Sequence, residues 1–206
     1  MMDITLIGGG GHSISCIDVI ESHSAFNILG IVDNKLSNGD LVSGYPVIGS
    51  DDDLDVLIKK NPNFLIAIGQ IKSPSARKQA FTNLQGLGAS FPHVISPFSY
   101  FSSGSKLGDG SIVMHGAVVN RNVSIGKNCI INSNALIEHD AEVGPNCHIS
   151  TGSIINGGAN IGEGTFIGSG AILKEGIRIG SNVVIGAGQL ILSDIPDNEI
   201  LAKRQT

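Results

Sequence analysis

Several residue types that mark common protein classes are scarce in this chain. Its 206 residues include no tryptophan, 4% aromatic residues and only 15% charged residues. The 13 Lys and Arg are outnumbered by 18 Asp and Glu, for a formal net charge of -5, and they form no basic block that could neutralise a run of phosphates. We therefore expect no nucleic-acid partner, since such partners need clustered positive charge.

Cysteine and long apolar stretches are also scarce. The three cysteines, Cys16, Cys129 and Cys147, form no CxxC pair, and their odd number argues against a disulfide framework. No apolar run approaches the ~18 residues that a membrane-spanning helix requires. No basic segment precedes a long apolar stretch near Met1. These absences predict a soluble, unprocessed protein of the reducing cytoplasm that does not insert into a membrane.

Glycine, in contrast, is abundant. The chain has 28 glycines, well above the average usage of about 7%. With 41% hydrophobic residues, the composition predicts a fold that has an adequate core and also needs many tight corners. The length allows one large domain or two small ones.

A six-residue repeat runs through the C-terminal half of the sequence. Such a repeat decides the fold class. Stepping by six from Ile95 always meets a large apolar residue, in the series Ile95, Phe101, Leu107, Val113, Val119, Ile125, Ile131, Ile137, Val143, Ile149, Ile155, Ile161, Ile167, Leu173, Ile179, Ile185 and Ile191. A period of six does not match the 3.6-residue α-helix, and the many β-branched residues favour strands.

Two further patterns describe the corners between these strands. Four residues after most of the apolar positions stands a small residue, as at Ala117, Ala135 and Ala159. Every third repeat has a glycine directly after its apolar residue, in the series Gly108, Gly126, Gly144, Gly162 and Gly180. We interpret three hexapeptides as one eighteen-residue triangular coil in which one edge has its own turn chemistry.

These patterns predict an all-β left-handed parallel β-helix over residues 93–206. A sandwich of short strands is the alternative, but its turns would not keep a constant spacing. Cys129 and Cys147 both occupy the small-residue position, eighteen residues apart. We expect them to stack in neighbouring coils as packing residues that carry no chemistry.

Residues 1–92 follow a different pattern, in which strands alternate with helices. This pattern predicts a Rossmann-like α/β domain with a parallel sheet. The expected strands cover residues 3–7, 26–32 and 64–68, and the expected helices cover residues 13–22 and 75–87, the second started by Pro74. The domain lacks the second half of a complete dinucleotide fold, which favours a single nucleotide over NAD.

A glycine-rich segment, Gly8-Gly9-Gly10-Gly11-His12-Ser13, lies between the first expected strand and the first expected helix. Without Cβ atoms, backbone N–H groups can approach a phosphate at a helix N-terminus. The segment departs from GxGxxG because Ser13 stands in place of the third glycine. Asp33 closes the second strand, where such folds bind a ribose or sugar hydroxyl. We predict a nucleotide site here; a glycine-rich turn with a solvated aspartate is the alternative.

His139 has the most informative setting of the histidines in the predicted β-helix. It stands two residues after the inward Ile137, so its ring should project from an edge of the coil. A neighbouring carboxylate would fix the tautomer of the imidazole and leave the other nitrogen to accept a proton. Asp140 is the first candidate for this carboxylate and Glu138 the second. An ordinary surface histidine in an acidic turn is the alternative interpretation.

Four segments occur together in an order that resembles the bacterial sialic-acid and bacillosamine-type sugar acyltransferases, the NeuD/PglD-like family. They are the GGGGHS loop, Val32-Asp33-Asn34, Ile66-Ala67-Ile68-Gly69 and Ile137-Glu138-His139-Asp140. Each segment is weak evidence alone, but the combination is specific and spans nearly the whole chain. The resemblance implies an acetyl-CoA-dependent sugar N-acetyltransferase that needs no metal.

The resemblance also implies roles for individual residues. His139 would be the general base and Asp140 the carboxylate that raises its basicity, although many relatives carry the longer Glu there. The residues implied to contact a nucleotide-linked amino sugar, such as a UDP-4-amino-4,6-dideoxy sugar, are Gly10, Gly11, His12, Asp33, Asn34 and Gly69. Those implied to line the acetyl-CoA site are His148, Ser169 and Ala187. In such proteins three chains form a homotrimer, and acetyl-CoA lies between neighbouring β-helices.

The sequence is also compatible with other functions. The same base could deprotonate a hydroxyl, as in O-acetylation of sialic acid, and a folded trimer could act as a non-catalytic nucleotide-sensing scaffold. A γ-type carbonic anhydrase needs three histidines around a metal, and its local spacing is absent because His139 and His148 stand nine residues apart. Relatives commonly end in a Gly-x-Pro-Ala-Lys turn, whereas Ile200-Leu201-Ala202-Lys203-Arg204 lacks its Gly and Pro, so contacts from this end to CoA phosphates are not expected.

Overall fold

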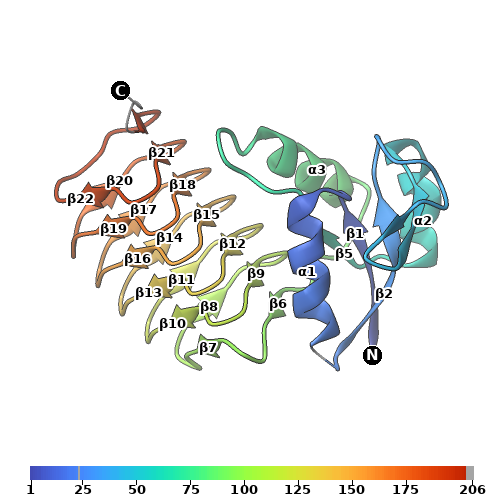
Figure 1. Cartoon of the computed structure of the whole chain (residues 1–206), viewed down its shortest axis with the longest axis horizontal. Coiled ribbons are helices and arrows are strands. Elements are labelled where there is room, and N and C mark those ends of the chain that lie inside the picture. The colour runs from blue at the N-terminus through green and yellow to red at the C-terminus, as the bar shows by residue number, and fades with distance from the viewer. Residues whose placement is uncertain (23, 203–206) are drawn as a thin grey trace. The chain divides into compact units, whose positions relative to one another are not determined.

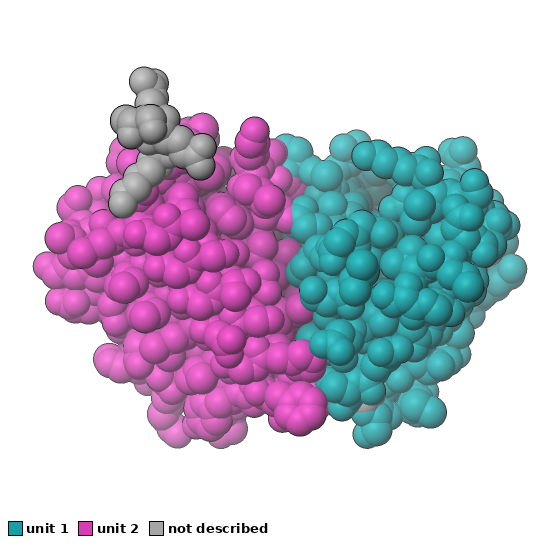
Figure 2. Space-filling view, in the orientation of Figure 1, with its two compact units in different colours: residues 1–69, 75–94 teal, residues 70–74, 95–206 magenta. Residues whose placement is uncertain are grey.

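A computed structural model describes residues 1–22 and 24–202 of the chain. The chain divides into two compact units, which Figure 2 colours separately. Unit 1 comprises residues 1–69 and 75–94, and unit 2 comprises residues 70–74 and 95–206. The short loop of residues 70–74 therefore groups with the C-terminal unit, although unit 1 supplies the chain on both sides of it. Lys203 and Arg204, part of the atypical tail, lie outside the described residues.

Unit 1 is a five-stranded sheet flanked by helices, in the strand order β3-β4-β2-β1-β5. Its strands are β1 (Met2–Ile7), β2 (Phe26–Val32), β3 (Leu41–Val42), β4 (Tyr45–Gly49) and β5 (Phe64–Ile66). Its helices are α1 (Gly11–Glu21), the short 3-10 helix η1 (Asp51–Asp53), α2 (Leu54–Lys60) and α3 (Ser75–Gly86). All pairs are parallel except β3 with β4, so the predicted α/β class is confirmed.

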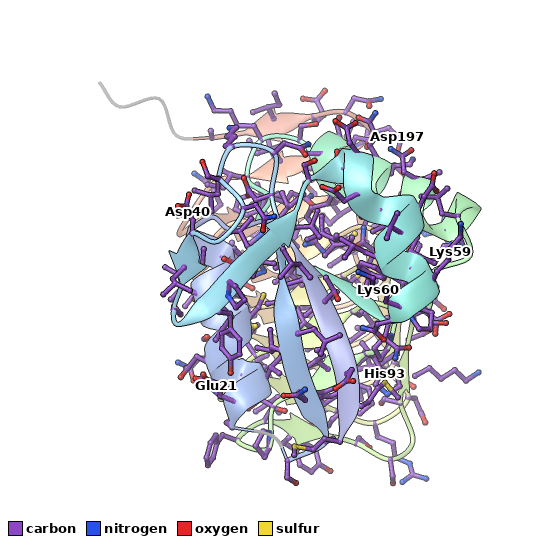
Figure 3. All side chains as sticks on the ribbon, turned by 90° about the vertical axis from the view of Figure 1, so that its right-hand side faces the viewer. Glu21, Asp40, Lys59, Lys60, His93 and Asp197 are labelled. Atoms are coloured by element: carbon purple, nitrogen blue, oxygen red, sulfur yellow. The ribbon has the colours of Figure 1, made fainter. Side chains whose placement is uncertain are left out.

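Side chains from both faces of this sheet are buried, because strand residues alternate in direction. Ile7 and Ile66 pack on one face with Phe81 and Leu84 of α3. Helix α1 lies on the side of the strands opposite α2, as Figures 1 and 3 both show. Figure 3 marks Glu21 at the end of α1, where its carboxylate accepts a hydrogen bond of 3.1 Å from the Tyr45 hydroxyl.

The structure adds elements that the sequence pattern did not reveal. β3 and β4 form a hairpin around Ser43 and Gly44, whose φ angles of 47° and 87° belong to the primed turn that suits tight hairpins. Strand β5 ends at Ile66, two residues before the predicted end. Beyond this point the backbone is held by a side chain, because the buried Arg77 guanidinium donates hydrogen bonds to the carbonyl oxygens of Ile66 and Ile68.

Unit 2 is a stack of triangular coils with three parallel sheets as its faces (Figure 1). Sheet 1 contains β6 (Val94–Ile95), β9 (Ile112–Val113), β12 (Ile130–Ile131), β15 (His148–Ile149), β18 (Phe166–Ile167), β21 (Val184–Ile185) and β23 (Ile200–Leu201). Sheet 2 contains β7 (Tyr100–Phe101), β10 (Val118–Val119), β13 (Leu136–Ile137), β16 (Ile154–Ile155), β19 (Ile172–Leu173) and β22 (Leu190–Ile191). Sheet 3 contains β8 (Lys106–Leu107), β11 (Ser124–Ile125), β14 (Glu142–Val143), β17 (Asn160–Ile161) and β20 (Arg178–Ile179).

The predicted six-residue series fills the interior of this stack. From Val113 to Ile191 its members form one buried cluster, and Ile95, Phe101 and Leu107 pack against the cluster at the first coil. Cys129 and Cys147 are buried in the same cluster, and neither forms a disulfide among the described residues. The parallel register of eighteen residues, for example Ile137 with Ile155, matches the predicted coil. The architecture fits the predicted left-handed β-helix.

Two kinds of residue shape the corners of the coils. Most corners contain a residue with left-handed backbone, and Gly, Asn or Asp stands there, as at Asn134 with φ of 57°. The eighteen-residue glycine series has another cause. A Cβ on Gly126 would lie 2.5 Å from the Pro145 nitrogen in the next coil, so close backbone approach excludes any side chain. The predicted special edge is real, and close coil packing explains it.

The outer faces of sheets 2 and 3 differ in chemistry. The outward column of sheet 3 is polar and consists of Lys106, Ser124, Glu142, Asn160 and Arg178. The outward column of sheet 2 is apolar and consists of Tyr100, Val118, Leu136, Ile154, Ile172 and Leu190. No helix in the described part of the chain is long and apolar enough to cross a membrane.

Candidate active site

His139 and Asp140 occupy the corner between β13 and β14, on the edge where sheet 2 meets sheet 3. Both side chains are exposed, by 66% and 57%. The Nδ1 atom of His139 lies 2.8 Å from Oδ2 of Asp140. A carboxylate only accepts hydrogen bonds, so this contact places the proton of the neutral imidazole on Nδ1. Nε2 then carries the lone pair that a general base needs.

The local backbone explains why a short acid stands next to the histidine. Asp140 has φ of 60°, in the left-handed region that other corners fill with Asn or Gly. Its second oxygen, Oδ1, accepts a 3.0 Å hydrogen bond from Nδ2 of Asn122 in the preceding coil. The carboxylate is therefore held on both sides. These two hydrogen bonds, from His139 first and Asn122 second, lower the pKa of Asp140 from its ordinary value.

Glu138, the second candidate partner, points elsewhere. Its Oε2 accepts a 2.9 Å hydrogen bond from Nδ2 of Asn120, eighteen residues earlier, and a longer one of 3.4 Å from the backbone N–H of His139. The structure therefore pairs the imidazole with Asp140 and ties Glu138 to the neighbouring coil.

Gly157 lies directly next to the His139 ring, in the following coil. A Cβ built on Gly157 would lie 2.9 Å from both Cε1 and Nε2 of His139. The φ of Gly157 is not in the left-handed region, so the backbone itself would accept other residues. Glycine is required at position 157 because the His139 ring occupies the space that a side chain would need. Among the described residues, the N–H of Gly157 donates to no acceptor.

The glycine-rich loop of unit 1 forms the start of α1, with Gly10 as the N-cap. Cβ atoms on Gly10 or Gly11 would meet nothing within 4 Å, so the loop is open above both residues. Within the described chain, their N–H groups donate to no acceptor. Free N–H groups at the start of an 11-residue helix suit a phosphate.

The Asp33 carboxylate stabilises the glycine-rich loop through a hydrogen bond from a backbone N–H group of the loop. Its Oδ2 accepts a 2.7 Å hydrogen bond from Gly9 N, and its Oδ1 accepts from Lys35 N at 2.7 Å and Leu36 N at 3.3 Å. Burial alone would raise the pKa of Asp33, but these backbone donors outweigh it and lower the pKa below the ordinary value. The structure thus gives Asp33 backbone partners in addition to any predicted contact with a sugar.

The other residues predicted for the acceptor side also lie in unit 1. The Asn34 amide exchanges two hydrogen bonds with Asp51, of 2.8 and 2.9 Å. Gly69 follows β5, and a Cβ there would lie 3.2 Å from Cβ of His12. The structure therefore brings Gly69 and His12 together at the start of α1.

The residues predicted to line the acetyl-CoA site fall into two groups. Ser169 and Ala187 are exposed and follow sheet 1 strands, on the edge where sheet 1 meets sheet 2. The Ser169 hydroxyl lies 3.0 Å from that of Ser150. His148, in contrast, is only 6% exposed and starts β15 on the outer face of sheet 1. His139 and His148 thus occupy different places on the coil, and no group of three His, Cys, Asp or Glu within the described residues could hold a metal.

Sequence reasoning missed Asn122 and Gly157 as parts of the site around His139. Both stand eighteen residues from a predicted site residue, Asn122 before Asp140 and Gly157 after His139. The coil period that revealed the fold could therefore have revealed them, because residues one coil apart stack on the same edge.

Comparisons with known proteins bear on the family of the chain. Residues 3–84 match the family described as PglD N-terminal domain, and residues 122–157 and 158–188 match bacterial transferase hexapeptide repeats. No curated protein sequence matches the chain.

Solved structures match over nearly the whole length. A His-to-Asn variant of perosamine N-acetyltransferase from Caulobacter crescentus, in complex with CoA and GDP-perosamine, is 30% identical with a TM-score of 0.90, over 97% of this chain and 93% of that one. The acetyltransferase domain of PglB from Neisseria gonorrhoeae FA1090, in complex with acetyl coenzyme A, is 30% identical with a TM-score of 0.90, over 98% and 96%. WeeI from Acinetobacter baumannii AYE, at 22% identity and a TM-score of 0.84, shows the shared fold over 98% and 97%. The chain belongs to the NeuD/PglD-like family of hexapeptide-repeat sugar acyltransferases.

Proposed function

We propose that this protein transfers the acetyl group of acetyl-CoA to the amino group of a nucleotide-linked amino sugar. The observation that carries the proposal is the His139–Asp140 pair, with a 2.8 Å hydrogen bond that leaves Nε2 of an exposed imidazole as a proton acceptor. Two relatives support the chemistry, since one was solved with CoA and GDP-perosamine and the other with acetyl coenzyme A.

In the proposed reaction, the amine nitrogen attacks the thioester carbonyl carbon while Nε2 of His139 accepts a proton from that nitrogen. The C–N bond forms, the C–S bond breaks, and the proton passes from His139 to the departing thiolate, giving the amide and CoA. Asp140 stabilises the imidazolium that forms between these steps. We assign to the N–H of Gly157, which donates to no acceptor among the described residues, the role of stabilising the developing oxyanion. No covalent intermediate with the enzyme is needed.

The acceptor site is proposed for unit 1. Gly10 and Gly11 offer backbone N–H groups to the diphosphate, and Asp33 keeps their loop in shape through Gly9. His12, Asn34 and Gly69 complete the site at the ends of the neighbouring strands. A UDP-linked 4-amino-4,6-dideoxy sugar is our first choice of acceptor, and a GDP-linked amino sugar, as in the relative, is the main competitor.

We further propose that the active form is a homotrimer. The outward column of sheet 2 is apolar and open to solvent, with Tyr100 57% and Leu190 60% exposed. Sheet 2 separates the edge with His139 from the edge with Ser169 and Ala187. A groove between two neighbouring chains would therefore bring His139 of one chain near Ser169 and Ala187 of the next, around one acetyl-CoA. The three cysteines are buried and form no disulfide among the described residues, which suits the reducing cytoplasm that we propose as the location of the protein.

The proposal is tested by incubating the purified protein with acetyl-CoA and a panel of UDP- and GDP-linked amino sugars, with free sialic acid as a hydroxyl acceptor. Mass spectrometry and NMR of the product identify the acetylated atom. We expect an amide on one nucleotide-linked amino sugar. Acetylation of a hydroxyl alone would overturn the assignment of the acceptor. No transfer at all, together with no heat of binding for acetyl-CoA at millimolar concentration, would indicate a non-catalytic scaffold.

A further inference from the structure

His148 has partners that the proposed reaction does not use. It is the first residue of β15, points outward from sheet 1 and is only 6% exposed. Its Nδ1 lies 2.7 Å from the carbonyl oxygen of Gln70, and its Nε2 lies 3.0 Å from Nδ2 of Asn132. The ring also meets the Phe166 ring edge-on, with centroids 5.2 Å apart. Both ring nitrogens are therefore engaged within the chain.

These partners fix the tautomer of His148. A carbonyl oxygen only accepts, so Nδ1 must carry the proton that is donated to Gln70. Nε2 of the neutral ring then accepts from the Asn132 amide, whose Oδ1 accepts a 2.8 Å hydrogen bond from Ser133 N and so cannot turn toward the ring. The network selects a neutral imidazole with one defined donor and one defined acceptor.

The loop that His148 holds is attached at both of its ends. The Gln70 side chain is 3% exposed, and its Nε2 donates a 3.1 Å hydrogen bond to the Gly164 carbonyl. At the other end, a Cβ on Gly164 would lie 3.0 Å from Cγ of Pro74, so the proline ring packs on this glycine. Residues 70–74 are thus seated on the β-helix by His148 and Gly164 together, which explains why this short loop groups with unit 2.

Gln70 follows directly after Gly69, which we place in the acceptor site. The Gln70 carbonyl, which belongs to the peptide between residues 70 and 71, is held by His148, and the Gln70 side chain is held by Gly164. These two attachments restrain the Cα of Gln70, to which the peptide from Gly69 is joined, and so limit the backbone conformations open to Gly69. We infer that His148 is a positioning residue for the acceptor, which acts through the Gln70–Gly69 backbone and not through contact with the thioester. The inference rests on the proposed function, and it gives His148 a different role from the acetyl-CoA contact that the family resemblance implies.

Two amide substitutions separate the roles of the two ring nitrogens. The side-chain nitrogen of Asn can take the place of Nδ1, whereas that of Gln reaches only the place of Nε2. His148→Asn should therefore keep the hydrogen bond to Gln70, and His148→Gln should lose it. Losing one hydrogen bond of ordinary strength corresponds to about a 10-fold change. We expect KM for the nucleotide sugar to rise about 10-fold in His148→Gln and to stay within about threefold in His148→Asn.

The dissociation constant for acetyl-CoA, measured by calorimetry, distinguishes the two roles. We expect it to be unchanged in both variants. A weakened affinity for acetyl-CoA with an unchanged KM for the sugar would overturn the inference, and so would equal KM values for the two variants. Hydrogen exchange of the peptide that contains residues 68–76 should be faster in His148→Gln alone. This readout needs no substrate, so the loop attachment can be judged even if the wild-type protein acetylates no amino sugar.

Discussion

Replacing Gly157 by alanine tests whether the position of the His139 ring limits the reaction. The new Cβ would lie 2.9 Å from Cε1 and Nε2 of His139, whereas carbon atoms pack at about 3.5–4.0 Å. The ring must therefore shift by roughly 0.6–1 Å. The imidazole is 66% exposed and free to swing outward, so the shift should stretch its hydrogen bond to Asp140 and leave the fold intact.

A misplacement of about 1 Å costs about 10²-fold in rate, so we expect Gly157→Ala to lower kcat by about 10- to 100-fold. The thermal midpoint and the affinity for acetyl-CoA should change little, because the ring yields and the backbone N–H remains. Steady-state kinetics and differential scanning fluorimetry measure both effects. Gly86→Ala is the matched control, since a Cβ on Gly86 meets nothing within 4 Å. A normal kcat for Gly157→Ala would refute the idea that the absence of a side chain at Gly157 sets the position of the His139 ring.

Three further predictions concern other parts of the structure. Asn tolerates the left-handed φ of 60° at position 140, so the Asp140→Asn variant should fold normally. Its kcat should fall at least about 10-fold, and an unchanged kcat would show that the carboxylate does not assist His139. The pKa of Asp33 is lowered in the folded protein, so the contribution of its carboxylate to stability is complete above the unfolded pKa of about 3.9 and is lost as the pH falls through the lower folded pKa. Urea titrations should therefore show Asp33→Asn less stable than the wild type at pH 7 but approaching it below about pH 4. A difference in stability that does not depend on pH would contradict this prediction. Ile172→Lys on sheet 2 should break the trimer in sedimentation velocity experiments, whereas Asn160→Lys on sheet 3 should not; equal behaviour of the two variants would place the interface elsewhere.

The β-helix could be predicted from the sequence because the same packing requirement repeats every six residues. Each inward position from Val113 to Ile191 meets the same requirement for a large aliphatic side chain, and a departure at any coil would leave a void or an unpaired polar group. The corners were harder to interpret. From the sequence, Gly126 is expected to be a turn residue, whereas the folded structure shows that the Pro145 nitrogen of the next coil leaves no room for a side chain there.

The parts that sequence could not supply depend on contacts between distant or short segments. The β3–β4 hairpin is only 2 and 5 residues long on its two sides, too short for a clear alternating pattern. The attachment of Gln70 to His148 joins residues 78 positions apart. The pairing of His139 with Asp140 was visible because the two residues are neighbours, whereas the roles of Asn122 and Gly157 became clear only once the coils were stacked.

The most direct test of the account is the turnover of His139→Ala with acetyl-CoA and the accepted amino sugar. Calorimetry should first show that the variant binds acetyl-CoA about as tightly as the wild type. If Nε2 of His139 takes the proton from the attacking amine, kcat should then fall by at least about 10²-fold. Near-normal turnover in a variant that still folds and binds acetyl-CoA would contradict the assignment of His139 as the general base.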